Sequence, residues 1–191
     1  MGHLDGQQGQ FLVALAREAI ARELGQSTAP PSLEGQPHPA WLDEPGAVFV
    51  TLTRHGDLRG CIGSLEAHRS LRDDLRANAR AAAFDDPRFP PLSADELAAT
   101  RVEVSVLSPA EPMSFRGEAD FLAQLRPGVD GVILEYGWHR ATFLPQVWDQ
   151  LPEPRQFMAQ LKRKAGLAPD FWSPDLRLSR YGVEKFKEGT P

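Results

Sequence analysis

Proline and glycine residues divide this chain into short segments, and this division limits the folds that the chain can adopt. Of the 191 residues 17 are prolines, and many of them gather in residues 30–45, 87–91 and 145–154. A proline fixes φ and removes a backbone donor, so these stretches are neither helix interiors nor central strands. The regular elements must therefore be short and must lie between them.

Several segments between these breaks are predicted to be helices. Apolar residues recur at three- and four-residue steps in residues 8–24, 70–84 and 155–165, and residues 118–125 also have helical character. Gly25 and Gly166 are suited to end the first and last of these helices. Ser93 and Glu96 have the spacing of a capping box, which predicts a further short helix from Ala94. Residues 25–45 are expected to form a long ordered loop, held by Trp41 and Leu42.

The remaining segments have the patterns of strands. Residues 47–53 and 58–63 flank a short turn and predict a hairpin, and residues 131–136 and 139–144 predict a second one. Residues 101–108 alternate, with Val102, Val104 and Val106 on one face. Residues 175–187 have a weaker alternation, suited to one or two strands. Helices interleaved with hairpins favour an α+β fold with a mainly antiparallel sheet flanked by helices.

Composition narrows the class of protein. The net charge of -5 and a sequence pI near 5.5 argue against a general nucleic-acid binder. Residues 151–191 nevertheless carry eight Lys or Arg against five Asp or Glu, which fits either a solvated basic face or a docking surface for an acidic partner or RNA. No signal peptide, membrane span or phosphate-binding glycine motif is visible, so we expect a soluble cytoplasmic protein with no membrane association.

The single cysteine gives the best lead to a site. Cys61 lies between Gly60 and Gly63 on a predicted strand, after Arg59. Glycines inside a strand indicate that something approaches the backbone closely, either a ligand or another segment of the chain. One cysteine allows no internal disulfide, and the five histidines are scattered, so we expect no structural zinc.

Two interpretations of Cys61 follow from its surroundings. In the first it is a nucleophile: Arg59 lowers the thiol pKa or holds an anionic substrate, and Ser64 or a glycine N–H stabilises an oxyanion. Strand alternation places Arg59, Cys61 and Gly63 on one face, and Gly60 and Ser64 on the other. The candidates for a general base are His55, His68 and Glu103. In the second interpretation the cysteine is buried and inert, and the glycines let a helix pack tightly.

Other candidate residues also have two interpretations. Arg88 is either an anion-binding group or an ion-pair partner that holds the proline-rich loop, and Glu103 is either an acid–base group or the cross-strand partner of a basic residue. Trp138, Trp148 and Trp172 fit either a partner surface or core and loop-anchoring positions.

Motifs spread over most of the chain resemble the AMMECR domain family, whose bacterial and archaeal members are also called protein A of the AmmeMemoRadiSam system. The resemblance rests on these segments: Leu58-Arg59-Gly60-Cys61-Ile62-Gly63, Asp86-Pro87-Arg88-Phe89-Pro90-Pro91-Leu92, residues 102–107, 128–134, 141–145 and 161–166, and Arg180-Tyr181. Ser64 departs slightly from the family, where many members carry Thr.

The resemblance implies one domain over residues 1–191, in two unequal lobes, with the cysteine segment near a cleft between them. It also implies a genomic association with a Memo-like protein and a radical S-adenosylmethionine protein, which are the possible partners. Two classes of function stay open: a small-molecule enzyme or ligand-binding protein built around Cys61, with Arg59, Gly60, Gly63, Ser64, Arg88 and Glu103 as binding residues, or a non-catalytic adaptor. Neither a cofactor nor an oligomeric state follows from the sequence.

Overall fold

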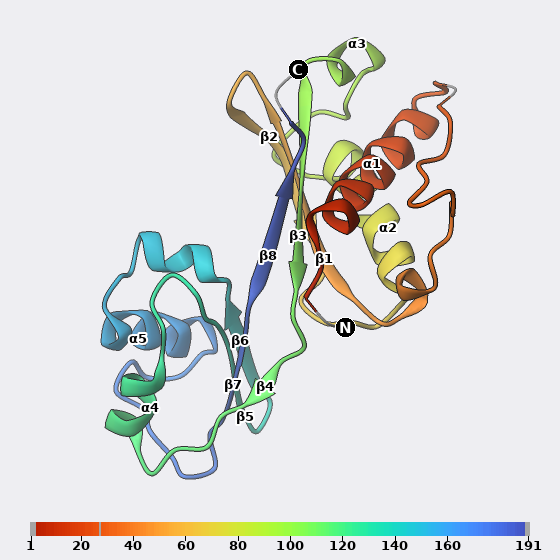
Figure 1. The fold of residues 1–191 in the computed structure, drawn as a ribbon. Coiled ribbons are helices and arrows are strands. Elements are labelled where there is room, and N and C mark those ends of the chain that lie inside the picture. Colours follow the sequence, from red (N-terminus) through yellow and green to blue (C-terminus); the bar gives the residue numbers. More distant parts are fainter. Residues whose placement is uncertain (1–2, 27, 190–191) are drawn as a thin grey trace. The chain divides into compact units, whose positions relative to one another are not determined.

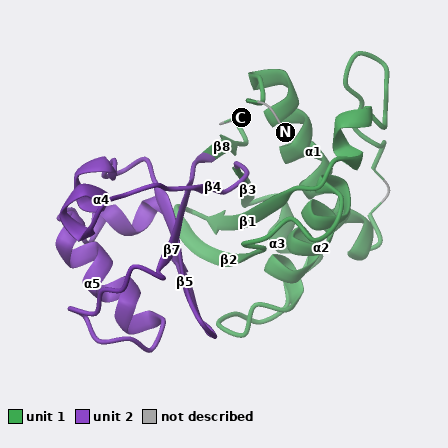
Figure 2. Ribbon diagram, turned by 90° about the horizontal axis from the view of Figure 1, so that it is seen from below, with its two compact units in different colours: residues 1–107, 184–191 green, residues 108–183 purple. Residues whose placement is uncertain are grey.

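The chain divides into two compact units, each with its own sheet. The structure, a computed structural model, describes residues 3–26 and 28–189. Unit 1 comprises Met1–Leu107 and Glu184–Pro191, and unit 2 comprises Ser108–Val183 (Figure 2). None of the helices in the described part of the chain is long and apolar enough to cross a membrane.

Unit 1 is a four-stranded sheet with helices on one face (Figure 1). Its strand order is β2-β1-β3-β8, and β1 is antiparallel to both neighbours. The strands are β1 (Ala47–Arg54), β2 (Asp57–Gly63), β3 (Thr100–Leu107) and β8 (Val183–Lys187). The helices are α1 (Gly6–Glu23), the 3₁₀ turn η1 (Ala40–Asp43), α2 (Leu71–Phe84) and α3 (Ala94–Leu97).

The core of unit 1 lies between the sheet and helices α1 and α2. Val48, Val50 and Leu52 alternate along β1 and are completely buried, as are Leu71 and Leu75 of α2. The same alternation turns Phe49, Thr51 and Thr53 to the opposite face, where they are half-buried. The sheet therefore has one face packed on helices and one face that carries polar side chains.

Unit 2 has a second antiparallel sheet and a core rich in rings. Its strand order is β4-β7-β5-β6. The strands are β4 (Glu111–Pro112), β5 (Gly131–Tyr136), β6 (His139–Phe143) and β7 (Arg177–Tyr181), and the helices are α4 (Glu118–Gln124), the 3₁₀ turn η2 (Pro145–Asp149) and α5 (Pro154–Lys164). Trp148 stacks on Phe157 of α5 with ring centroids 3.8 Å apart. Its indole N–H donates to the Asp130 carbonyl at 2.7 Å.

The predicted elements are confirmed, with two additions. The α+β class, the antiparallel hairpins and the capping box of α3 all occur, and residues 175–187, expected to form one or two strands, contain β7 and β8. Leu42 is fully buried beneath the long loop, as expected. The division into two sheets and the two-residue strand β4 were not predicted, because β8 returns to unit 1 from a distance of about 80 residues and no local pattern encodes that pairing.

Candidate functional site

Cys61 lies near the end of β2, the edge strand of the sheet in unit 1. It pairs with Thr51 on β1, and Thr51 pairs in turn with Glu103 on β3. The Cys61 Sγ lies 3.3 Å from Thr51 Oγ1, and either atom can donate the hydrogen bond. The thiol is half-buried on the face of the sheet opposite α1 and α2. Thr51 is thus the hydrogen-bond partner of the thiol, and Glu103 is the next residue across the sheet.

The backbone of Cys61 is held by two residues of the loop after α2, which we call the Asp86–Arg88 clamp. The Cys61 N–H donates to Asp86 Oδ2 at 2.9 Å, and Arg88 Nη2 donates to the Cys61 carbonyl at 3.3 Å. Arg88 Nε and Nη2 also donate to the two Asp86 oxygens, at 2.9 and 2.7 Å. The N–H and C=O groups of Cys61 thus point away from β1 and bond to the clamp. Cys61 and Thr51 are therefore a non-hydrogen-bonded pair of the antiparallel ladder, the type of pair in which the two side chains lie closest together.

The clamp shifts the pKa values of both its members. Hydrogen bonds from the Arg88 side chain and from the Cys61 backbone hold the pKa of the Asp86 carboxyl well below its usual range, against the opposing effect of burial. The pKa of Arg88 is raised, chiefly by its hydrogen bond to the Asp86 carboxylate. Both effects keep the clamp fully charged at neutral pH.

A second ionic cluster joins the other end of β2 to α3. Arg59 donates to both oxygens of Glu96, at 3.1 and 2.9 Å, and Arg54 Nη1 donates to Glu96 Oε1 at 2.6 Å. The Arg59 hydrogen bonds and a bond from the Ser93 N–H lower the pKa of Glu96 to about 2. Two guanidinium groups thus share one carboxylate.

Phe89 links this cluster to the clamp. The Cζ atoms of Arg59 and Arg88 lie 5.9 and 5.5 Å from the centroid of its ring. Among the described residues, Arg59 Nη1 is buried without a hydrogen-bond partner. These ion pairs thus bring three guanidinium groups and two carboxylates to this part of β2.

The two glycines beside Cys61 accommodate other parts of the chain. A Cβ on Gly60 would lie 2.0 Å from the carbonyl oxygen of Ala82 in α2, and a Cβ on Gly63 would lie 2.2 Å from the ring of Phe49. Of the two reasons considered for glycine in this strand, the close approach of another segment is the one observed. Gly60 is required by helix packing, and Gly63 provides the space that the Phe49 ring fills.

Ser64 points away from the thiol. Its hydroxyl donates to Asp74 Oδ1 at 2.6 Å and accepts from Asn78 Nδ2 at 3.0 Å, both on α2. Asp74 also accepts the Val48 N–H at 2.9 Å. Ser64 therefore belongs to a buried polar network that joins α2 to the sheet. The sequence analysis did not identify Asp74 or Asn78. Both lie on the apolar face of α2, and a polar residue on such a face is a sequence signal that could have identified them.

The proposed general bases are separated in the structure. Glu103 lies on the same face as Cys61 with Thr51 between them, and its carboxylate pairs with Lys187 of β8 at 2.9 Å. His68 is exposed and pairs with Glu66 at 2.9 Å, while His55 occupies the β1–β2 turn with a φ of 53°. The described residues contain no group of three His, Cys, Asp or Glu arranged to hold a metal ion.

Relatives of this chain are found in several archaea. A protein of Methanothermobacter thermautotrophicus is 41% identical and is matched over 97% of this chain and 96% of its own length. A protein of Thermococcus onnurineus is 40% identical over 100% of this chain and 95% of its own. The crystal structure of the uncharacterised protein PH0010 from Pyrococcus horikoshii superposes with a TM-score of 0.79 at 36% identity, covering 98% of this chain and 95% of that one.

The family match spans both units. A model of the AMMECR1 family matches residues 13–186, a range that includes the Asp86–Arg88 clamp, Cys61 and every strand of unit 2. The chain belongs to the AMMECR1 family.

Proposed function

We propose that the chain binds a small anionic molecule beside Cys61, with Arg88 holding the anion and the thiol in contact with the ligand. The Asp86–Arg88 clamp is the observation that carries this proposal. The Asp86 side chain is only 2% exposed, whereas the Arg88 side chain is 53% exposed. The ion pair therefore directs its positive end toward solvent, next to a half-buried thiol.

The surrounding charges favour the same class of ligand. Arg54, Arg59 and Arg88 outnumber Glu96 and Asp86, so the region attracts carboxylates and phosphates. In this proposal Arg88 takes the role that the sequence analysis gave to Arg59, because the Arg59 side chain is only 10% exposed whereas that of Arg88 is 53% exposed.

The cellular location and the partner proteins are also part of the proposal. The resemblance to proteins of the AmmeMemoRadiSam system suggests action in the cytoplasm together with a Memo-like protein and a radical S-adenosylmethionine protein. The cleft around the Arg-Gly-Cys-Ile-Gly segment stays a prediction.

The charge of the site is tested by alkylating Cys61, which is the chain's single cysteine. We compare the rates for iodoacetate, an anion, and iodoacetamide, its neutral analogue, in the folded and urea-unfolded protein. One unscreened charge at about 4 Å corresponds to roughly a 5-fold rate difference in water, so the iodoacetate-to-iodoacetamide ratio should be several-fold higher in the folded protein and should fall with added salt.

Matched variants assign the effect to Arg88. Arg88→Gln should lower the ratio and Arg88→Lys should preserve most of it. Arg80→Gln should leave the ratio unchanged, because Arg80 is similarly exposed but lies on α2 and pairs with Glu23 of α1, on the other side of the sheet from the thiol. Protection of the thiol from both reagents until the protein unfolds would overturn the proposal and make Cys61 a packing residue. A ratio equal to that of the unfolded chain would also overturn it.

An adaptor without catalytic activity is the second candidate, and Trp138 favours it. This side chain is 90% exposed at the tip of the β5–β6 hairpin, where it stacks on His139 with ring centroids 5.3 Å apart. His139 is fixed by a 2.8 Å hydrogen bond to the Ala165 carbonyl at the end of α5. An exposed tryptophan is a residue type that anchors protein interfaces.

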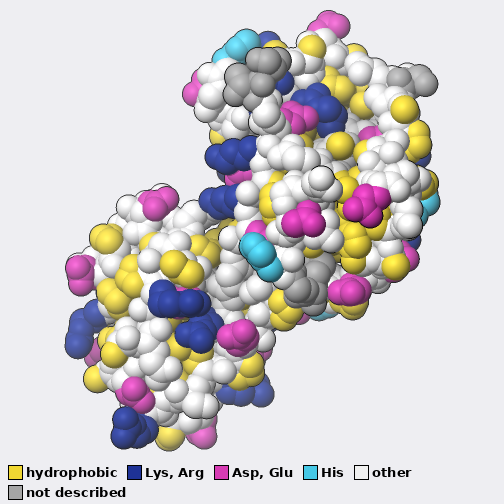
Figure 3. All heavy atoms as spheres, viewed as in Figure 1, with side chains coloured by type: hydrophobic (Ala, Val, Ile, Leu, Met, Phe, Trp, Pro, Cys, Tyr) yellow, Lys and Arg dark blue, Asp and Glu magenta, His cyan; other side chains and the backbone are white. Residues whose placement is uncertain are grey.

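The adaptor predicts a complex that Trp138→Ala weakens and that Cys61→Ser leaves intact. The ligand-binding function predicts that Cys61→Ser weakens binding of the anion and that Trp138→Ala leaves it intact. On the face shown in Figure 3 the Lys and Arg side chains lie among Asp and Glu side chains and form no continuous basic surface.

A further inference from the structure

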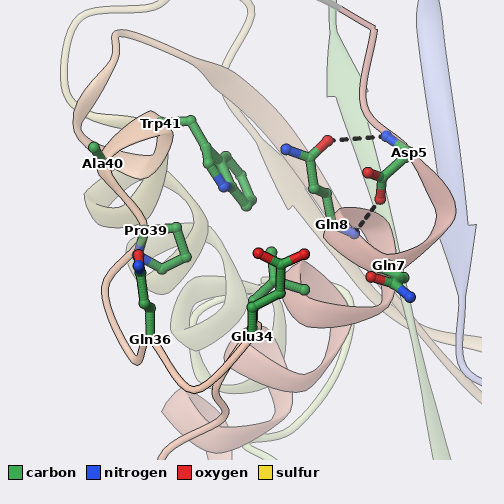
Figure 4. A pocket seen from close by; sticks show the side chains of 9 residues that line it. Asp5, Gln7, Gln8, Glu34, Gln36, Pro39, Ala40 and Trp41 are labelled. Atoms are coloured by element: carbon green, nitrogen blue, oxygen red, sulfur yellow. Dashed lines mark hydrogen bonds between the residues drawn. The ribbon is translucent and has the colours of Figure 1, made fainter.

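A hollow in unit 1, separate from the residues around Cys61, has the chemistry of a second binding site. It has a volume of about 280 Å³ and lies between the N-terminus of α1, the turn at residues 33–36 and η1. Figure 4 shows the residues that line it. A hollow of this size accommodates a small molecule or one long side chain.

One wall of the hollow is the indole of Trp41. This ring is half-buried and packs edge-on against Phe11 of α1, with centroids 6.2 Å apart and an interplanar angle of 70°. Figure 4 shows the indole turned toward the side chains of Gln8 and Glu34. The contact with the core fixes the ring, and the hollow leaves part of its surface available to a ligand.

The charged side chains of the lining are both acidic. They are Asp5 and Glu34, and the polar residues Gln7, Gln8 and Gln36 are neutral amides. No Lys, Arg or His contributes to the lining, so the carboxylates are not neutralised from within the hollow. An aromatic ring flanked by carboxylates attracts a cation through both charge and the ring quadrupole.

The acidic groups are held in place by local structure. Asp5 Oδ1 accepts the Gln8 N–H at 2.8 Å, and Gln8 Oε1 accepts the Asp5 N–H at 3.0 Å, which together form the capping box of α1. The tight turn that carries Glu34 is closed by two hydrogen bonds between the backbones of Leu33 and Gln36, at 3.0 and 2.8 Å. Figure 4 shows the Glu34 carboxylate directed toward the middle of the hollow.

We propose that this hollow binds an organic cation, either a primary ammonium or a guanidinium. The alkyl part packs against the Trp41 ring, and the charged end lies near Asp5 and Glu34. The net charge of -5 on the whole chain assists the approach of a cation. The ligand is either a free amine or a Lys or Arg side chain of a peptide, and both present the same recognition chemistry.

The test uses the indole N–H resonances of the full-length ¹⁵N-labelled protein. The chain has four tryptophans, and Trp41→Phe identifies the Trp41 signal. The protein is titrated with putrescine and with 1,4-butanediol, its uncharged analogue. We expect the Trp41 signal to shift saturably with putrescine and to stay in place with butanediol. A parallel titration with a capped glycine-lysine-glycine peptide and its Nε-acetylated form distinguishes the two sources: tighter binding of the diamine indicates a free amine, and tighter binding of the peptide indicates a protein side chain.

Two isosteric variants make the test specific to the hollow. Glu34→Gln should weaken putrescine binding about 3- to 5-fold, the effect of losing one exposed ion pair. Glu153→Gln changes the net charge equally in unit 2, where Glu153 precedes α5 and makes no capping hydrogen bond, and it should leave the affinity unchanged. The proposal is overturned if neither cation shifts Trp41, if butanediol shifts it equally, or if both variants weaken binding to the same extent.

Discussion

The two units of this protein build their interiors from different side chains. Among the described residues, the buried cluster of unit 1 is almost entirely Leu, Val, Ile and Ala, and Phe11 is its one buried ring. The buried cluster of unit 2 contains Phe121, Trp148 and Phe157, with five further aromatic residues packed against it. Contacts between large rings thus contribute more to unit 2 than to unit 1, through both buried area and geometry-dependent attraction.

Polar contacts between residues distant in sequence add directional geometry to the apolar core of unit 1. The clamp joins Asp86 to Cys61, Glu96 joins α3 to β2, and Arg17 of α1 pairs with Glu188 beyond β8. In unit 2 Arg126 and Asp130 are only four residues apart, and the buried Lys162 joins α5 to Glu118 of α4. Aliphatic side chains pack without directional preference, so directional charged contacts are what fix the loops around Cys61.

The largest expected effect is a loss of ring packing in unit 2. Trp148→Ala removes the stack on Phe157 and the hydrogen bond to Asp130, and should lower the free energy of unfolding by about 4 kcal/mol. Hydrogen exchange measured peptide by peptide should show the loss of protection first in residues 108–183. Trp138→Ala is the control and should change stability by less than about 0.5 kcal/mol, because that ring is exposed. Equal loss of protection in both units would contradict the inference that ring packing contributes more to unit 2 than to unit 1.

An intermediate effect is expected where α2 meets β2 in unit 1. Gly60→Ala places a methyl group 2.0 Å from the Ala82 carbonyl oxygen, and the helix must move to accept it. We expect a destabilisation of about 2 kcal/mol, with increased exchange at the Cys61 N–H as the clamp loosens. Gly6→Ala is the matched control, since nothing lies within 4 Å of its added Cβ. Denaturant unfolding of both variants measures the difference, and equal stabilities would show that α2 adjusts freely.

The smallest effect is an acid sensitivity concentrated in unit 1. The pKa of Glu96 falls from 4.5 to about 2 in the folded protein, and that of Asp86 is also lowered. The stability contributed by these groups is therefore complete above about pH 4.5 and is lost as the pH falls toward 2. We expect a loss of the order of 1–2 kcal/mol from Glu96, after allowance for solvent screening.

This acid sensitivity is measured by urea unfolding between pH 5.5 and 2.5, with exchange reporting on each unit. Glu96→Gln should remove part of the pH dependence in unit 1 while lowering its stability at pH 7. Asp120 of unit 2 also has a lowered pKa, caused mainly by the Arg116 N–H, but its ion-pair partner Arg116 is 96% exposed and contributes little. A steeper acid response in unit 2 than in unit 1 would contradict the comparison.

Local patterns in the sequence were sufficient for most of the elements. The boundaries of α1, α2, β1 and β2 agree with the expected ones within two residues, because each has a periodic apolar face and a cap, turn or glycine at its end. Gly25 and Gly166 have φ values of 72° and 78°, as residues that terminate helices should. The alternation rule also correctly separated the faces of Cys61 and Ser64.

The contacts around Cys61 were harder to predict, because they join residues distant in sequence. Strand alternation placed Arg59 beside Cys61, yet Glu96, 37 positions away, binds that guanidinium. The ion-pair role considered for Arg88 is observed, but its bond to the Cys61 carbonyl spans 27 positions and has no local signature. The basic partner considered for Glu103 is Lys187 on β8, a strand that returns from the far end of the chain.

The Asp86–Arg88 clamp has a further consequence for how unit 1 meets other chains. β2 is an edge strand, and an uncovered edge accepts a strand from another molecule through its free N–H and C=O groups. At Cys61 both groups are already bound by side chains that cannot continue a sheet. The clamp therefore blocks sheet extension at this residue, so that the segment carrying the thiol is kept from templating aggregation.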